Sequence, residues 1–153
     1  MSRAYVALGA NLGDREATIR AALAELDAAA GVDVVAVSSL AETDPVGYLD
    51  QPRFLNGAVA LETSLGPRAL LDLLLAVERR FGRRREGVPP QGPRTLDLDL
   101  LLLESAEIDE PGLTIPHPRL HERAFVLEPL AELDRSLEVP GKGEVQALLE
   151  GLH

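Results

Sequence analysis

The chain of 153 residues has no cysteine, no tryptophan and a single methionine. Without cysteine it can form no disulfide bonds, and nothing in its composition implies export to an oxidising compartment. No run of about 18 apolar residues exists, so the sequence predicts no transmembrane helix. The first residues enter a strand-like run and lack the apolar stretch of a signal peptide. We therefore expect a cytoplasmic protein that forms one domain over residues 1–153.

Positive charge is scarce and unevenly placed. The chain has 15 basic and 25 acidic residues, which gives a net charge of −10. This balance argues against a nucleic acid or an anionic membrane as a partner, because both need a broad basic surface. Residues 79–94 nevertheless contain six arginines and one glutamate. A concentrated basic segment in an acidic protein is suited to binding a small polyanion. Separately, we expect the protein to be a monomer or a weak homodimer.

Stretches with the hydrophobic pattern of a strand and stretches with that of a helix are intermixed along the chain. Apolar alternation and β-branched runs predict strands, and stripes at helical spacing between capping and breaking residues predict helices. The expected strands cover residues 5–8, 32–39, 54–62, 96–103 and 113–115. The expected helices start after Asp14, at residue 67, at residue 124 and at about residue 144, and residues 41–52 are expected to form a long loop. This mixture predicts an α+β sandwich, a mainly antiparallel sheet with helices on its faces.

The stretch from Gly92 to Leu103 contains two aspartates within an apolar strand. Side chains on a strand alternate between its faces, so Asp97 and Asp99 share one face, with Cα atoms about 7 Å apart. Two carboxylates on one face of an apolar strand favour a hard divalent cation between them, and Arg94 precedes them as an anion-binding group would. The pair alone is equally compatible with an exposed edge strand that has one polar face.

Two other patterns also leave more than one interpretation. Phe54 and Asn56 share a face of their strand, which could stack on and hydrogen-bond a flat heterocycle or could be ordinary packing. His117, His121 and Arg123 are clustered. Their spacing lacks the glutamate and third ligand of a zinc protease site, and a role in binding phosphate fits the other motifs better.

Six motifs in order resemble one known family, the 6-hydroxymethyl-7,8-dihydropterin pyrophosphokinases of folate biosynthesis. The resemblance covers nearly the whole chain, and its most specific part is the Gly-Pro-Arg-Thr-Leu-Asp-Leu-Asp sequence. The matching segments are residues 7–14, 42–47, 51–56, 78–83, 92–99 and 115–127. The family implies a ferredoxin-like α/β/α fold. It also implies transfer of pyrophosphate from ATP to the hydroxymethyl group of 6-hydroxymethyl-7,8-dihydropterin, which gives AMP and the pterin diphosphate, with two Mg²⁺ ions bound to ATP.

The resemblance also implies roles for particular residues. Catalysis would involve Arg83, Arg94, Asp97 and Asp99, of which the two aspartates would bind both metal ions. ATP would be bound by Glu78, Arg85, Arg94, Leu100, Thr114, His117 and Arg123. The pterin would be bound by Thr43, Asp44, Val46, Phe54, Asn56 and Phe125, with the two phenylalanines as stacking faces.

The chain departs from some family members at three positions. Gln91 stands where some have tryptophan, Pro118 where some have tyrosine, and Leu75 where some have glutamine. These changes affect the loop before the aspartates and contacts to ATP. Two alternatives remain at this point: another two-metal nucleotide-dependent transferase on a ferredoxin-like fold, and a binding module of that fold without catalytic activity.

Overall fold

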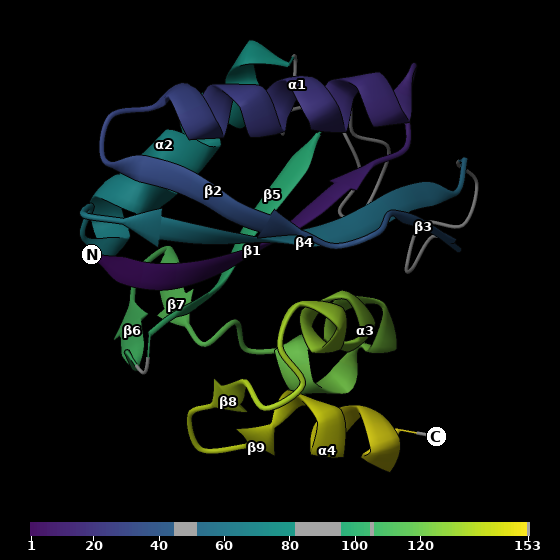
Figure 1. Cartoon of the computed structure of the whole chain (residues 1–153), viewed down its shortest axis with the longest axis vertical. Coiled ribbons are helices and arrows are strands. Elements are labelled where there is room, and N and C mark those ends of the chain that lie inside the picture. The colour runs from purple at the N-terminus through teal and green to yellow at the C-terminus, as the bar shows by residue number, and fades with distance from the viewer. Residues whose placement is uncertain (45–51, 82–95, 105, 153) are drawn as a thin grey trace.

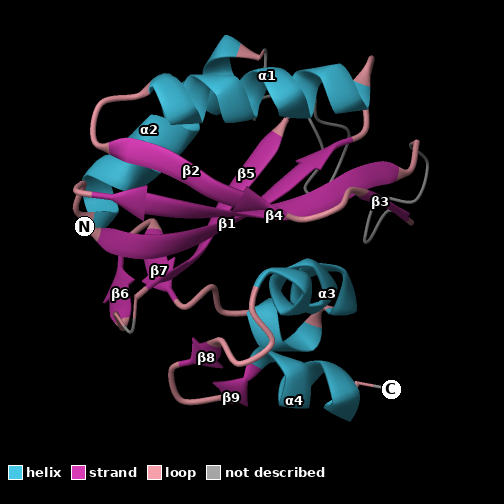
Figure 2. Cartoon of the chain, viewed as in Figure 1, coloured by secondary structure: helices cyan, strands magenta, loops and turns pink. Residues whose placement is uncertain are grey.

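The structure is a computed structural model that describes residues 1–44, 52–81, 96–104 and 106–152. Its elements in chain order are β1 (Ser2–Ala10), α1 (Arg15–Ala28), β2 (Val32–Val37), β3 (Ala41–Thr43), β4 (Phe54–Thr63), α2 (Pro67–Arg80), β5 (Asp97–Leu103), β6 (Ile108–Glu110), β7 (Leu113–Ile115), the 3₁₀ helix η1 (Leu120–Glu122), α3 (Ala124–Leu133), β8 (Glu138–Val139), β9 (Gly143–Glu144) and α4 (Val145–Gly151). Figure 2 shows where these helices and strands lie in the fold. Within the described residues, no helix has the length and hydrophobicity needed to cross a membrane.

The central sheet has the strand order β2-β4-β1-β5, and β3 pairs with β4 outside this path. All its strand pairs are antiparallel. With the short strand β3 set aside, the first elements along the chain are β1-α1-β2-β4-α2-β5, which is the βαββαβ unit of a ferredoxin-like fold. The predicted α+β fold with a mainly antiparallel sheet is therefore confirmed.

Helices cover both faces of the sheet, so the molecule has α/β/α layers (Figure 1). On one face α1 and α2 bury residues such as Ile19, Leu26 and Leu74 against the sheet. On the other face α3 and α4 bury Leu127 and Val145. The sheet residues alternate between these two cores, as their period of two requires.

Two helix starts agree with the capping residues of the sequence. Asp14 is the N-cap of α1, where its side chain accepts a hydrogen bond from the Ala17 amide at 3.2 Å. Pro67 occupies the first turn of α2, where a missing N–H costs nothing. Both helices begin within a residue or two of the expected positions because their caps are local features.

The structure differs from expectation in two short segments. Residues 41–43 belong to strand β3 rather than to a loop, and β8 and β9 form a hairpin in a region where only a turn was expected. Strands of two or three residues are too short to show an alternating pattern, so only their pairing partners reveal them. The remainder of the expected 41–52 loop, residues 45–51, lies outside the described residues.

Candidate active site

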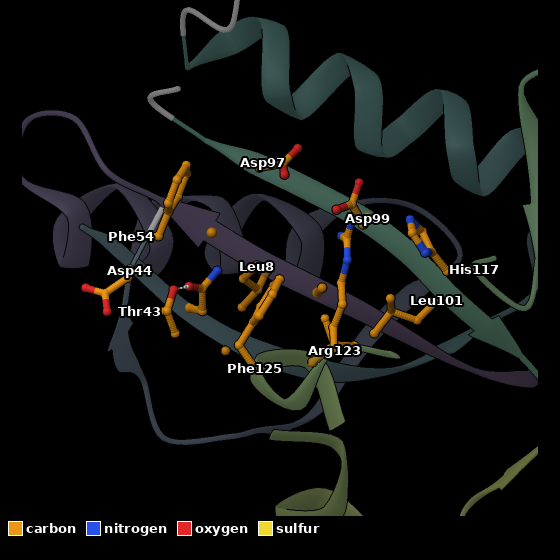
Figure 3. Close-up of a pocket in the computed structure, with 15 residues that line it drawn as sticks. Leu8, Thr43, Asp44, Phe54, Asp97, Asp99, Leu101, His117, Arg123 and Phe125 are labelled. Atoms are coloured by element: carbon orange, nitrogen blue, oxygen red, sulfur yellow. Dashed lines mark hydrogen bonds between the residues drawn. The ribbon is translucent and has the colours of Figure 1, made fainter. Parts of the chain in front are cut away.

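One pocket opens on the α3 side of the sheet, where β1 ends and where β4 and β5 begin (Figure 3). It has a volume of about 250 Å³. Of its fifteen lining residues, nine are expected site residues: Thr43, Asp44, Phe54, Asn56, Asp97, Asp99, His117, Arg123 and Phe125. These nine residues, of which Thr43 and Phe125 are 82 positions apart in the sequence, thus meet at one end of the sheet, between β3 and α3.

The floor of the pocket consists of small residues on the central strand β1. Gly9 pairs with Asn56 of β4 on one side and with Asp97 of β5 on the other. Ala7 likewise lies between Ala58 and Asp99. Neighbouring strands are about 4.8 Å apart, so the backbone positions of Asn56 and Asp97, on either side of Gly9, are about 10 Å apart. The absence of larger side chains between them leaves room for a ligand.

Asp97 and Asp99 share the pocket face of β5, and both are half-buried. Leu98 and Leu100 point to the opposite core, as the alternation predicts. Figure 3 shows both carboxylates above the strand at the edge of the cavity. Two carboxylates at this position can supply oxygen ligands to Mg²⁺, which typically takes one or two carboxylates and completes its shell with water and substrate phosphates.

His117 lies on the opposite side of the carboxylate pair from Phe54 (Figure 3). Its backbone N–H donates to the Leu101 carbonyl at 2.9 Å, which ties the segment after β7 to β5. Burial lowers the pKa of His117, and the nearby charge of Arg123 adds to this effect, while Asp97 opposes it. The Nδ1 atom accepts a hydrogen bond from the Arg119 amide at 3.2 Å. The neutral ring therefore carries its proton on Nε2, which can donate to a ligand.

Arg123 directly precedes α3, and its side chain enters the pocket and extends toward Asp99 (Figure 3). Burial lowers its pKa and the charge of Arg119 acts in the same direction, whereas Asp99 and Asp97 raise it. A guanidinium stays protonated despite such a shift, so Arg123 supplies a permanent positive charge. This positive charge can bind a phosphate group, and its place beside the two carboxylates would suit a phosphate that also binds a metal ion there.

The other half of the pocket has aromatic side chains. Phe54 is 9% exposed at the start of β4, and Phe125 is half-buried in the first turn of α3. The Cζ atom of Arg123 lies 5.7 Å from the centroid of the Phe125 ring, within the range of a cation–π contact. The two rings approach the cavity from different elements, as the labels in Figure 3 show. A flat ring system fits such a site.

Asn56 is oriented by its neighbours on this aromatic side. The hydroxyl of Thr43 donates a hydrogen bond to Oδ1 of Asn56 (Figure 3). A Cβ atom on Gly9 would lie 2.9 Å from Nδ2 of Asn56, closer than real contacts allow. Glycine is therefore required at residue 9 if the Asn56 amide is to stay where it is. There the amide offers a ligand both a donor and an acceptor.

Three expected ATP-binding residues lie elsewhere in the structure. Glu78 is 2% exposed on α2, and Leu100 is buried on the same side of the sheet, the side opposite the pocket. Thr114 is exposed on β7 and does not line the cavity. Their proposed contacts with ATP remain predictions. Four other expected site residues, Arg83, Arg85, Arg94 and Val46, lie outside the described residues, as does Gln91.

The structure adds lining residues that the sequence did not reveal. Ala7 and Gly9 form the floor, and Leu101 lies beside the aspartates. The register between β1 and β5 shifts between Tyr5 and Val6, which pair with Leu102 and Leu100. Leu101 lies on the pocket side by the same alternation as Asp97 and Asp99, and the irregularity places Leu102 on that side as well. A bulge of this kind leaves no signal in an uninterrupted run of leucines.

The fold and the pocket together define an α+β domain suited to binding a flat ring next to phosphate groups, with a carboxylate pair between them. A family model described as 7,8-dihydro-6-hydroxymethylpterin-pyrophosphokinase (HPPK) matches residues 5–135. The chain belongs to this family.

Individual relatives agree with this assignment. The chain is 53% identical over 135 residues to a 2-amino-4-hydroxy-6-hydroxymethyldihydropteridine pyrophosphokinase of Bacillus subtilis, covering 88% of this chain and 80% of the relative. It is 46% identical over 149 residues to the Pseudomonas aeruginosa protein of the same name, covering 97% and 91% of the two chains. A crystal structure described as HPPK-DHPS in complex with substrates has a TM-score of 0.78 at 12% identity. That match covers 98% of this chain but only 43% of the solved one, and at this identity it supports the fold alone.

Proposed function

We propose that this protein transfers the pyrophosphoryl group of ATP to the hydroxymethyl oxygen of 6-hydroxymethyl-7,8-dihydropterin, in folate biosynthesis. The oxygen attacks the β-phosphorus of ATP, the bond between that phosphorus and the α–β bridging oxygen breaks, and the hydroxyl proton is released. The products are AMP and the pterin diphosphate. One observation carries this proposal: Asp97 and Asp99 lie between an aromatic, amide-bearing half of one pocket and a half that contains His117 and Arg123.

The aromatic half would bind the pterin. Phe54 and Phe125 provide faces on which a flat bicyclic ring can stack, and Asn56 can pair with its amide-like edge. Thr43 fixes the Asn56 amide, which reduces the entropy lost when the ring binds. Asp44 lies at the rim of this half, and the backbone of Val46 is predicted to assist. Stacking and paired hydrogen bonds place the hydroxymethyl group toward the carboxylates.

The basic half would hold the phosphates of ATP. Arg123 can make paired hydrogen bonds to phosphate oxygens, and His117 can donate from Nε2. We expect Arg83, Arg85 and Arg94 to add positive charge, because phosphoryl transfer depends on positioning and charge neutralisation more than on covalent chemistry. Glu78, Leu100 and Thr114 remain the predicted contacts for the nucleoside.

The carboxylate pair fits Mg²⁺. Asp97 and Asp99 offer oxygen atoms on one face of one strand, which suits a hard cation whose other ligands come from ATP and water. Two ions bound there would neutralise charge on the phosphates and help to align the reacting oxygens. Half-burial of both aspartates leaves them accessible to a ligand while the surrounding protein reduces competition from water.

The decisive experiment incubates the protein with ATP, MgCl₂ and 6-hydroxymethyl-7,8-dihydropterin and separates the nucleotides. Formation of AMP and the pterin diphosphate in equal amounts, lost on addition of EDTA, is the expected result. Production of ADP, or of a cyclic or nucleotidylated product, would favour another two-metal nucleotide-dependent transferase. Pterin and ATP binding without turnover and without dependence on Mg²⁺ would favour a binding module. A cytoplasmic location and a monomer or weak homodimer remain predictions.

A further inference from the structure

We propose that Arg15 is a positioning residue for the pterin half of the pocket. It would act through Glu42 and the Arg53 carbonyl to hold strand β3 against β4, and so keep Thr43 in contact with Asn56. This inference rests on the proposed function, because it concerns the site assigned to the pterin ring. It adds a helix on the other face of the sheet to the parts of the protein that determine pterin affinity.

Strand β3 has little to hold it in place by itself. It contains three residues, which pair with β4 as Ala41 with Asn56, Glu42 with Leu55 and Thr43 with Phe54. Its side chains are exposed or half-buried, and none is fully buried in either core. A strand this short, paired along one edge, has few backbone hydrogen bonds and opens readily unless side chains restrain it.

Arg15 contacts both β3 and the segment that leads into β4. At the first residue of α1, its guanidinium donates from Nη2 to Oε1 of Glu42 at 2.6 Å and from Nη1 to the Arg53 carbonyl at 2.9 Å. The hydrogen bond from Arg15 lowers the pKa of Glu42, and its charge acts in the same direction. A planar guanidinium with several donors can hold two acceptors in a defined relative position, which a lysine ammonium does less well.

Two further side chains support the same junction. Arg53 contacts Glu42 at 3.2 Å through Nη1 and Asp44 at 3.1 Å through Nε. Asn11, which is 3% exposed, donates from Nδ2 to the Pro52 carbonyl at 3.0 Å. The turn that leads into α1, the end of β3 and the residues before β4 are thus connected at one point. Arg15 belongs to the helix and touches both strands' segments, so its removal should loosen this connection most.

The consequence for binding follows from the neighbouring residue. Thr43 directly follows Glu42 in the chain, and its hydroxyl bonds to Oδ1 of Asn56. If β3 moves away from β4, this hydrogen bond is lost and the Asn56 amide can rotate. The amide must then be ordered when the pterin binds, which weakens pterin binding without altering the phosphate half.

Arg15→Ala tests the proposal, and Arg20→Ala is the matched control. Arg20 lies on the same helix and pairs only within it among the described contacts, with Glu16 at 2.6 Å. Steady-state kinetics should show the KM for the pterin raised about fivefold in Arg15→Ala, as expected for losing a partly exposed ion pair and its hydrogen bonds. The KM for ATP should change less than about twofold, and Arg20→Ala should match the wild type within the same margin. The KM of Arg15→Lys for the pterin should lie between the values for Arg15→Ala and the wild type.

A measurement on the ligand-free protein separates this proposal from the proposed function. The side-chain amide NMR signals of Asn56 should shift in Arg15→Ala and stay in place in Arg20→Ala. If the wild type forms no AMP and these signals still shift, the function fails and the positioning role stands. Unchanged Asn56 signals, or equal rises in both KM values, would overturn the positioning role. Should Arg15→Ala not fold, Glu42→Ala must give the same pattern, and its failure to do so would also overturn the proposal.

Discussion

The Glu78 side chain accepts a hydrogen bond from the backbone N–H of Leu98, with 2.7 Å between Oε2 and the nitrogen. Leu98 lies between Asp97 and Asp99 on β5, the last strand in the order of the central sheet. An edge strand directs some of its N–H groups away from its neighbour, and burial makes an unpaired one costly. Glu78 thus stabilises the backbone that carries the carboxylate pair, from the side opposite the pocket.

Glu78→Ala should lower the free energy of unfolding by about 1–3 kcal/mol, because it leaves the buried N–H of Leu98 without this acceptor. Glu78→Gln keeps an acceptor oxygen and should cost less. Urea denaturation of both variants measures the difference, with Glu128→Ala at an exposed position of α3 as a control. A loss below about 0.5 kcal/mol in Glu78→Ala would show that the hydrogen bond contributes little.

Replacing either aspartate with asparagine should lower kcat by more than about a hundredfold, since a carboxylate ligand to the metal is lost. The fold should persist, because both side chains are only half-buried. The AMP assay and circular dichroism check these two outcomes for Asp97→Asn and Asp99→Asn. Asp109→Asn on β6, an exposed acid outside the pocket lining, serves as the control. A near-normal rate in either pocket variant would exclude that carboxylate as a metal ligand.

Gly9→Ala should raise the KM for the pterin about tenfold, because the new Cβ would lie 2.9 Å from Nδ2 of Asn56 and displace the amide. The effect on the KM for ATP should be smaller, since Asn56 lies in the aromatic half of the pocket. Gly66→Ala at the N-cap of α2 is a suitable control because a Cβ there meets nothing within 4 Å. Unaltered pterin kinetics in Gly9→Ala would mean that Asn56 does not bind the ring.

His117 should make the ligand-free protein less stable in mild acid. Its pKa in the folded protein is lowered from 6.5, so the unfolded chain takes up a proton before the folded one does. Its contribution to stability is therefore present above about pH 6.5 and is lost as the pH falls through the lower, folded pKa. Between about pH 7 and pH 5, the free energy of unfolding should fall more in the wild type than in His117→Gln.

Denaturant titrations in EDTA at several pH values measure this difference. Parallel pH profiles for the wild type and His117→Gln would contradict the assigned origin of the effect.

Residues close together in the sequence were predicted well. The helix 124–133 was expected where the structure has it, and the expected faces of β4 and β5 are confirmed. Strand alternation depends only on backbone geometry, so the shared face of Asp97 and Asp99 could be read from their spacing. The placement of Thr43 beside Asn56 could not, because β3 is too short to have a pattern and depends on pairing with β4.

The sequence by itself determined the aspartate pair on one face, the helix caps and, through six ordered motifs, the family. Only the tertiary structure decided that Gly9 lies between Asn56 and Asp97, that a bulge places Leu102 on the same side of the sheet as Leu101, and that Glu78 lies on the side opposite the pocket. Local patterns arise from the periodicity of a single element. Strand order, register and bulges arise from contacts between elements far apart in the chain, and these contacts decide which side chains share a site.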